Sequence, residues 1–349
     1  IALKKIQAQT GTVFSYNPAV IDGTKLITAN FHHRTLREIL DELFDGKVTY
    51  KVRKHYIIII PKTKNQSRKV TGYISDEDGK RLKDVTVYDP ATLVSTVTDN
   101  YGFFELKVKP ATDLKLVINK LSYADTLVEI KNKRRLLTIK IKNSTSRLLT
   151  ATDSIKVKVS RFWQRNFVNM ESVNVSDTLY RKFQFSVVPF IGTNHRLSGK
   201  VINDYSLNLY GGYALGVRRC EVGGIFNIIS GNVKGVQLAG TGNLVYGKTR
   251  GVQMGGLFNA NRDSTRGVQC AGVGNLNWNS ARGFGAAGIV NVTRKTSQGT
   301  MLAGVGNATF GEQRGVHVGG TFNASLGNAG PVQLAGIGNV CGGSMHGVQ

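Results

Sequence analysis

The sequence predicts a multidomain, mainly β protein with three kinds of module: a small α+β domain, a β-sandwich, and an antiparallel β-meander or barrel of 16-residue repeats. Short runs in which apolar and polar residues alternate cover most of the chain, and this pattern is typical of β-strands. Glycine is concentrated in one half, because 35 of the 41 glycines follow Phe183. These two observations place the boundaries at 1–65, 66–143, a linker at 144–182, and 183–349.

Residues 1–65 combine helical and strand patterns. A short amphipathic helix precedes Gly11, and Thr35 with Glu38 has the spacing of a capping box before a second helix. Strands are expected at 13–16 and 26–31, and a hairpin at 48–60.

The stretch from Ala2 to Ile60 resembles the short N-terminal domain shared by secretins and TonB-dependent receptors, although the opening strand of that family is missing. In receptors of that type the domain lies in the periplasm and contacts an anti-sigma regulator or a neighbouring machine. The resemblance therefore implies a periplasmic protein partner of one of these kinds for residues 1–65. A plain structural spacer is the alternative, because the family pattern is a hydrophobic core and not a binding site.

Residues 66–143 carry short alternating strands separated by turn signals. The turn Thr98-Asp99 to Gly102 and the runs around it resemble the carboxypeptidase regulatory-like domain, which implies a seven-stranded sandwich of transthyretin-like topology. In that family the sandwich is an accessory module, often found on envelope receptors of the Bacteroidota. A zinc carboxypeptidase is excluded because this segment contains no histidine. Asp76 and Asp78 are candidates for calcium or, more simply, for a solvated turn.

The linker at 144–182 begins with Ser and Thr residues. It contains Phe162-Trp163, which suits either a membrane interface or a buried anchor on the sandwich.

From Arg219 the chain repeats every 16 residues, and a ninth unit begins at Gly347. The sixth position is Gly and the ninth is Asn in all eight complete units. These structural positions are Gly224, Asn227, Gly240, Asn243, Gly256, Asn259, Gly272, Asn275, Gly288, Asn291, Gly304, Asn307, Gly320, Asn323, Gly336 and Asn339.

Each unit is predicted to form one strand of about ten residues and a turn, a length that suits a membrane-spanning strand. The eighth position alternates, as in Phe226 and Gly242, and the fifth alternates between Gly and Ala. A true period of 32 favours an antiparallel meander, which with two strands at 183–195 and 203–217 gives at least ten strands. A parallel solenoid with two strands per coil and a surface-attached repeat sheet stay open.

The repeat half also resembles the surface-repeat proteins of bacterial outer membranes, whose units run GVQLAG followed by Asn, as in residues 235–243. That resemblance implies a truncated outer-membrane barrel in contact with lipid. We expect the chain to be a fragment, because it opens inside a helical pattern and stops inside a repeat.

The net charge of +24 is spread over every segment, which argues against nucleic acid as a partner. Basic residues recur at the unit ends, where a meander would divide them between two rims and a solenoid would place them on one ridge. Either these residues bind lipid phosphates, or they are turn residues whose charges are solvated. They are Arg218, Lys234, Arg250, Arg266, Arg282 and Arg314.

No catalytic, cofactor or metal site is predicted. The three cysteines lack CxxC spacing, His32-His33 is a poor chelate in a strand, and the Gly-x-Gly copies fall inside strands instead of before a helix. We therefore expect a non-enzymatic cell-envelope protein, in the outer membrane with periplasmic signalling or docking domains. A surface adhesin or glycan-binding repeat protein, and a plugless relative of a TonB-dependent receptor, are the alternatives.

Overall fold

The computed structural model describes residues 2–16, 35–44, 48–53, 55–61, 67–109, 114–130, 136–144 and 170–349. The strand expected at 26–31, the pair His32-His33 and the pair Phe162-Trp163 lie outside these residues. The chain divides into two compact units, Ile1–Arg68 and Lys69–Gln349. Among the described helices, none has the length and apolar composition needed to cross a membrane.

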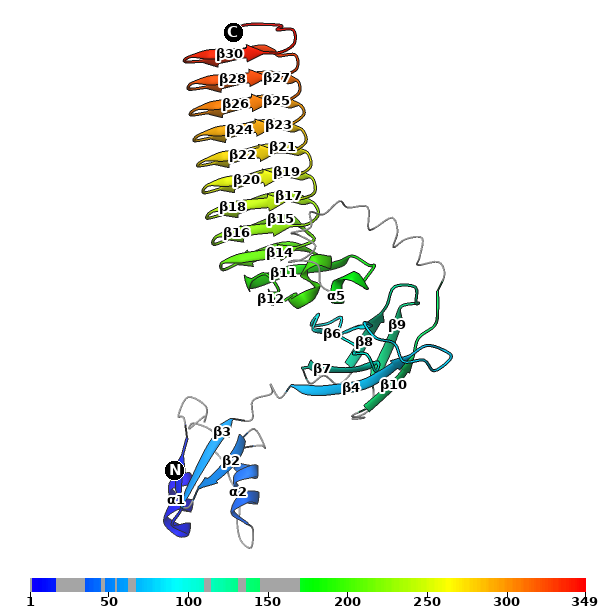
Figure 1. The fold of residues 1–349 in the computed structure, drawn as a ribbon. Helices are drawn as coiled ribbons and strands as arrows, with labels where there is room; N and C mark the ends of the chain where they lie inside the picture. The colour runs from blue at the N-terminus through cyan, green and yellow to red at the C-terminus, as the bar shows by residue number, and fades with distance from the viewer. Residues whose placement is uncertain are drawn as a thin grey trace. The chain divides into compact units, whose positions relative to one another are not determined.

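The first unit is the small α+β part that the sequence predicts (Figure 1). Its order is α1 (Ala2–Thr10), β1 (Val13–Ser15), α2 (Leu36–Leu43), β2 (Val48–Arg53) and β3 (Tyr56–Pro61). β3 pairs antiparallel with β2 and parallel with β1. The Thr35 side chain accepts the Glu38 N–H while the Glu38 carboxylate accepts the Thr35 N–H, so the capping box is confirmed. Ile6, Leu40 and Ile57 lie in the core.

The second module is a sandwich of two sheets, ordered β10-β4-β7 and β6-β5-β8-β9. Leu106, Leu116 and Ile118 are almost fully buried between them. The strands are β4 (Arg68–Ser75), β5 (Thr86–Tyr88), β6 (Ser95–Val97), β7 (Phe103–Val108), β8 (Leu114–Asn119), β9 (Thr126–Ile130) and β10 (Leu136–Lys140).

The last part of the region predicted as a linker, residues 170–181, packs against this sandwich. It begins with α5 (Met170–Val173), and Asn174 donates to the Asp84 carbonyl at 2.6 Å. The Arg181 guanidinium donates to the carbonyls of Pro90 and Ala91 at 2.6 and 2.9 Å. Val175 is buried in an apolar cluster that contains residues of the sandwich and of the first repeat strands.

The glycine-rich half is a parallel β-solenoid of 16-residue coils, in which each coil adds one strand to each of two sheets (Figure 1). We call the sheet of eleven strands the wide sheet and the sheet of nine strands the narrow sheet. Within the strands of the repeats, each residue pairs with the residue 16 positions later, as Gln237 does with Gln253.

The wide sheet consists of β11 (Leu179–Val188), β12 (Ile191–Gly192), β13 (Val201–Asn208), β15 (Gly216–Gly223), β17 (Val233–Ala239), β19 (Thr249–Gly255), β21 (Thr265–Ala271), β23 (Ala281–Ala287), β25 (Ser297–Ala303), β27 (Gln313–Gly319) and β29 (Pro331–Ala335). The narrow sheet consists of β14 (Gly211–Ala214), β16 (Phe226–Ile229), β18 (Gly242–Val245), β20 (Phe258–Asn261), β22 (Gly274–Asn277), β24 (Val290–Thr293), β26 (Gly306–Thr309), β28 (Phe322–Ser325) and β30 (Gly338–Cys341). A 3-10 helix, η1 (His195–Lys200), lies between β12 and β13.

The prediction of an antiparallel meander or barrel is wrong, and the alternation that suggested it has another cause. The ring of Phe258 covers Gly242 of the preceding coil, where an added Cβ would lie 2.7 Å from ring atoms. In the coil that carries Phe258, a Cβ at Gly255 would collide with the Phe258 carbonyl oxygen. Bulky and glycine coils therefore alternate along one parallel stack, and the period of 32 says nothing of strand direction.

Candidate functional site

The invariant glycines at the sixth repeat position are explained by close backbone approach. A Cβ at Gly256 would collide with the carbonyl oxygen of Gly240, and the same collision recurs between Gly272 and Gly256. Any side chain here would push neighbouring coils apart. The glycine row is therefore structural, and it marks the turn from the wide sheet to the narrow sheet that the predicted ten-residue strand missed.

The invariant asparagines form a ladder inside the solenoid. Asn243 donates from Nδ2 to Oδ1 of Asn259 at 2.8 Å and to the Met254 carbonyl at 2.8 Å, and the step repeats from Asn259 to Asn275. The side chain of each of these three is almost fully buried. Each side-chain amide thus forms hydrogen bonds with the asparagine and with a backbone carbonyl of the next coil. Polar groups buried inside a protein need such partners.

A second ladder of side-chain amides runs through the same interior and ends on a carboxylate. Gln253 donates to Gln237 at 2.8 Å, and Gln237 donates to Glu221 at 2.9 Å. Asn208 donates to the other oxygen of Glu221 at 3.0 Å. Burial raises the pKa of Glu221 to about 7, although the hydrogen bonds from Gln237 and Asn208 act in the opposite direction.

His317 occupies the glutamine position of its own coil. Its Nε2 lies 3.1 Å from the Ser297 hydroxyl, while Nδ1 is buried with no hydrogen-bond partner. Burial lowers the pKa of His317 to about 4, so the ring is neutral near pH 7. Within the described ranges, no group of three or more His, Cys, Asp or Glu side chains is arranged to hold a metal ion.

All the charge of the solenoid after Glu221 lies on one edge of the coils. We define this basic edge as repeat positions 12 to 16, residues 230–234, 246–250, 262–266 and their equivalents in later coils. From residue 222 to the end, the edge holds all nine Lys and Arg and both acidic residues. The basic residues are Lys234, Lys248, Arg250, Arg262, Arg266, Arg282, Arg294, Lys295 and Arg314.

Four successive unit-end cations form one ridge, as a solenoid requires, and Gln298 separates this ridge from Arg314. Lys234 pairs in register with Arg250, Arg250 with Arg266, and Arg266 with Arg282. All four side chains are exposed. Neighbouring strands are about 4.8 Å apart, so like charges face each other at every step of this ridge.

The two acidic residues of the edge leave most of the cations unneutralised. Glu312 pairs with Arg314. Burial alone would raise the pKa of Asp263, but hydrogen bonds from Asn279 and Ser264 and the nearby Lys248 hold it below its ordinary value. Over the part of the chain that the structure describes, none of the other eight cations forms an ion pair.

A second row on the basic edge mixes aromatic and guanidinium side chains at repeat position 12. Tyr246, Arg262, Trp278, Arg294 and Phe310 follow successive narrow-sheet strands. The Arg262 guanidinium lies 5.8 Å from the centre of the Tyr246 ring. An open groove of about 520 Å³ runs along the first four of these side chains, from Tyr246 to Arg294.

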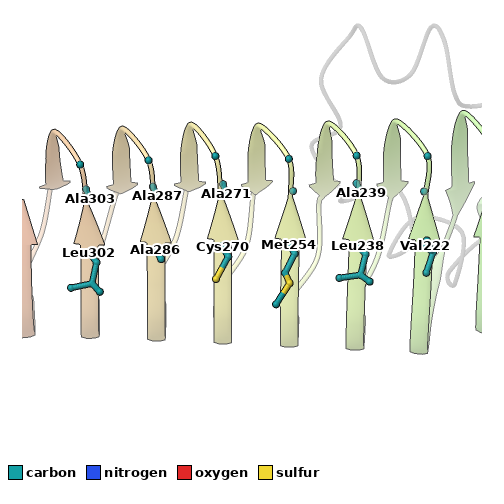
Figure 2. Close-up of a pocket in the computed structure, with 18 of the residues that line it drawn as sticks. Val222, Leu238, Ala239, Met254, Cys270, Ala271, Ala286, Ala287, Leu302 and Ala303 are labelled. Carbon is teal, nitrogen blue, oxygen red and sulfur yellow. The ribbon is translucent and has the colours of Figure 1, made fainter.

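The opposite edge of the wide sheet is apolar. Figure 2 shows Leu238, Met254, Cys270, Ala286 and Leu302 in one line on consecutive wide-sheet strands, along an open groove of about 880 Å³. No charged residue lines this groove. The solenoid therefore separates its surface into a charged edge and an uncharged one.

Sequence reasoning identified the unit-end cations but missed the position-12 row. Trp278 and Arg294 belong to no consensus, because position 12 changes residue type from coil to coil. In the sequence, the only sign of this row is that five large side chains, Tyr, Arg, Trp, Arg and Phe, follow one another at intervals of 16 residues. The spacing becomes meaningful once the coils are known to stack in register. The turn candidate Asp76 accepts the Lys80 N–H at 2.8 Å, as a turn former does.

The turn that supported the sandwich resemblance is tightly bonded. The Asp99 carboxylate accepts the N–H groups of Tyr101 and Phe103 at 2.8 and 3.0 Å, and Gly102 has a φ of +71°. The Thr98 hydroxyl donates to the Leu82 carbonyl at 2.7 Å and accepts the Val85 N–H at 2.9 Å. These bonds join the turn between β6 and β7 to the segment that precedes β5, so the role of the motif is structural.

Residues 70–153 match the family model of the CarboxypepD_reg-like domain. No curated protein and no solved structure matched the chain. The match covers the seven-stranded sandwich and the bonded turn at 98–102. Residues 70–153 are therefore a CarboxypepD_reg-like domain, and a parallel β-solenoid of 16-residue repeats follows it in the chain.

Proposed function

We propose that this protein is a non-enzymatic binding protein of the cell envelope, whose solenoid binds a linear acidic polysaccharide along the basic edge. One observation carries the proposal: every Lys and Arg after residue 222 lies on that edge, and eight of the nine form no salt bridge among the described residues. This corresponds to the adhesin or glycan-binding alternative of the sequence analysis.

A linear ligand fits the ridge better than a compact one. The cations of Lys234, Arg250, Arg266 and Arg282 are stacked in register over four coils. Like charges directly opposite each other destabilise a sheet. A polymer with evenly spaced anions would relieve this repulsion at every step. The relief of the repulsion would then contribute favourably to the free energy of binding.

Charge density favours a polysaccharide over nucleic acid. From Lys234 to Arg282 the ridge offers one cation per coil, about every 4.8 Å, whereas duplex DNA carries one charge per roughly 1.7 Å of axis. A chain of uronic acids, with one carboxylate per sugar ring, has the sparser spacing. Arginine, which makes up most of the edge cations, is the residue best suited to bidentate binding of carboxylates.

The remaining modules fit an envelope location. We propose that residues 1–65 dock on a periplasmic protein, as their resemblance implies; in the sequence, the sandwich follows this domain and precedes the solenoid. The CarboxypepD_reg-like domain is consistent with an accessory role. Contact with anionic lipid headgroups is the competing use of the same cations, and the experiment below distinguishes it.

The test is titration of the full chain with polygalacturonate by isothermal calorimetry. The variant Arg250→Ser/Arg266→Ser/Arg282→Ser should bind about tenfold more weakly, because each exposed ion pair contributes roughly 0.2–1 kcal/mol. Neutral dextran should not bind. Vesicles containing phosphatidylglycerol and a single-stranded oligonucleotide are titrated in parallel.

The matched control removes the same charge from the sandwich. Lys80, Lys107 and Lys109 are exposed there, and their replacement by Ser should change the affinity less than twofold. Equal weakening by both triple variants would reduce the effect to net charge and contradict the proposal. Tighter binding of vesicles or oligonucleotide than of polygalacturonate would also contradict it.

A further inference from the structure

We infer that Trp278, flanked by Arg262 and Arg294, forms a subsite that holds one acidic sugar ring of the polymer. The inference rests on the proposed function and deepens it, because the ridge alone would recognise any polyanion. Position 12 adds an aromatic surface that only a ligand with a flat apolar face can use.

The backbone fixes these three side chains at successive steps of the stack. The N–H groups of Arg262, Trp278 and Arg294 donate to the carbonyls of Val245, Asn261 and Asn277 at 2.8, 2.9 and 2.8 Å. Each residue therefore extends its narrow-sheet ladder by one bond. The guanidinium-bearing residues lie one coil on either side of Trp278, about 4.8 Å away along the stack.

The groove beside them has the composition of a sugar site. Its volume is about 520 Å³, and the apolar side chains of Leu244 and Ala260 are among those that line it. Trp278 is 49% exposed. An aromatic ring that is half covered and held by its backbone can pack against the C–H face of a pyranose, which loses water there as an apolar surface does.

The charges around Trp278 are available for a carboxylate. Asp263, the nearest acid in sequence to Arg262, is occupied by Asn279 at 2.9 Å and by the N–H of Ser264 at 2.6 Å. Neither arginine forms an ion pair among the described residues. A sugar ring stacked on Trp278 would place its carboxylate beside one of two guanidinium groups, each able to bind it through two parallel hydrogen bonds.

The neighbouring aromatic residues explain why Trp278 is the platform. The Arg262 guanidinium lies over the Tyr246 ring at 5.8 Å, an arrangement that orients the guanidinium and covers that ring. Phe310 is 57% exposed but does not line the groove. Trp278 is therefore the ring that combines exposure, the groove and two flanking cations.

The test uses the fluorescence of Trp278 in the full chain. The sequence has two tryptophans, so Trp163→Phe leaves Trp278 as the single reporter. Polygalacturonate should change its emission, whereas polyglutamate, which carries carboxylates without sugar rings, should bind the ridge and leave the emission unchanged. An equal emission change with both polymers would overturn the subsite.

Affinity measurements with variants complete the test. Trp278→Ala should weaken polygalacturonate binding about tenfold and leave polyglutamate binding unchanged, while Trp278→Phe should keep most of the affinity. Arg262→Gln/Arg294→Gln should also weaken polygalacturonate binding. Phe310→Ala is the matched aromatic control and should change affinity less than twofold.

The outcomes separate the two claims. If the triple ridge variant loses affinity and Trp278→Ala does not, the subsite is wrong and the proposed function stands. If the unmodified chain binds no polygalacturonate, both fail.

Discussion

The ring of Phe258 lies over Gly242, its in-register partner on the neighbouring narrow-sheet strand. The contact explains why bulky and glycine coils take turns in a stack whose strands are all parallel. Phe322 has the same relation to Gly306, where an added Cβ would lie 2.7 Å from the ring. The solenoid thus contains two coil types, one with Phe and one with Gly at the eighth position. The ring of one type packs on the glycine of the other, so the order of the coils matters for packing.

Gly242→Ala should destabilise the protein by about 1–3 kcal/mol, because the new Cβ has no room beside the Phe258 ring. Urea unfolding gives the value. Gly338→Ala is the matched control, since no heavy atom lies within 4 Å of a Cβ there, and it should cause little loss. Combining Gly242→Ala with Phe258→Ala should recover part of the cost; strictly additive effects would show that the two residues do not interact.

Asn259→Ala should cost about 2–4 kcal/mol, because it removes hydrogen bonds from buried polar groups in both neighbouring coils. Asn243 loses its acceptor, and the Cys270 carbonyl and Asn275 lose their donor. Asn339, in the last complete coil, is only half-buried, so Asn339→Ala should cost clearly less. Thermal unfolding measures both variants. An equal decrease in melting temperature for the two would contradict the claim that the buried hydrogen bonds of the ladder stabilise the fold more than the half-buried ones at its end.

Glu221→Gln should become increasingly stabilising, relative to the parent, as pH rises from 5 to 8. The pKa of Glu221 in the folded chain is raised to about 7, so its contribution to stability is complete below about pH 4.5 and is lost as pH rises through 7. The difference should reach roughly 3 kcal/mol, since each pKa unit corresponds to about 1.36 kcal/mol. Gln has one acceptor oxygen, so it keeps the hydrogen bond from either Gln237 or Asn208, and the loss of the other is an offset that does not change with pH.

Urea unfolding at several pH values measures this difference. His317 titrates in the opposite sense: its pKa is lowered to about 4, so its contribution is lost as pH falls from about 6.5 toward 4. That effect is common to both proteins and cancels. Glu312→Gln, at an exposed pair, should give a flat profile. A pH-independent gain from Glu221→Gln would mean that the carboxyl is not protonated in the fold.

The sequence predicts the local and strictly periodic features well. The capping box at Thr35 and Glu38 and the fixed Gly and Asn positions follow from rules that act within one unit or at a fixed interval. Strand direction does not follow from periodicity. An aromatic ring over a glycine, as in Phe258 and Gly242, and an antiparallel hairpin both produce a period of two units.

The candidate site was predicted only in part for a related reason. The ridge residues Arg250 and Arg266 share one residue type, so a consensus detects them. Arg262, Trp278 and Arg294 differ in type, and only the in-register stack brings them together. The polar interior was also missed, because a buried Gln or Asn looks like a surface residue until its ladder partner is known.

The most direct test of the account is the distance between spin labels at Lys234→Cys and Arg314→Cys, in a chain whose native cysteines are replaced. These positions lie five coils apart on the basic edge. Electron paramagnetic resonance should give about 24 Å, five strand spacings of about 4.8 Å, if all coils place their cations on one ridge. In a meander the labels would also be separated, at right angles to the stack, by a strand of about ten residues at 3.3 Å each. The resulting distance, near roughly 40 Å, would place the labels on opposite rims and contradict the single basic edge.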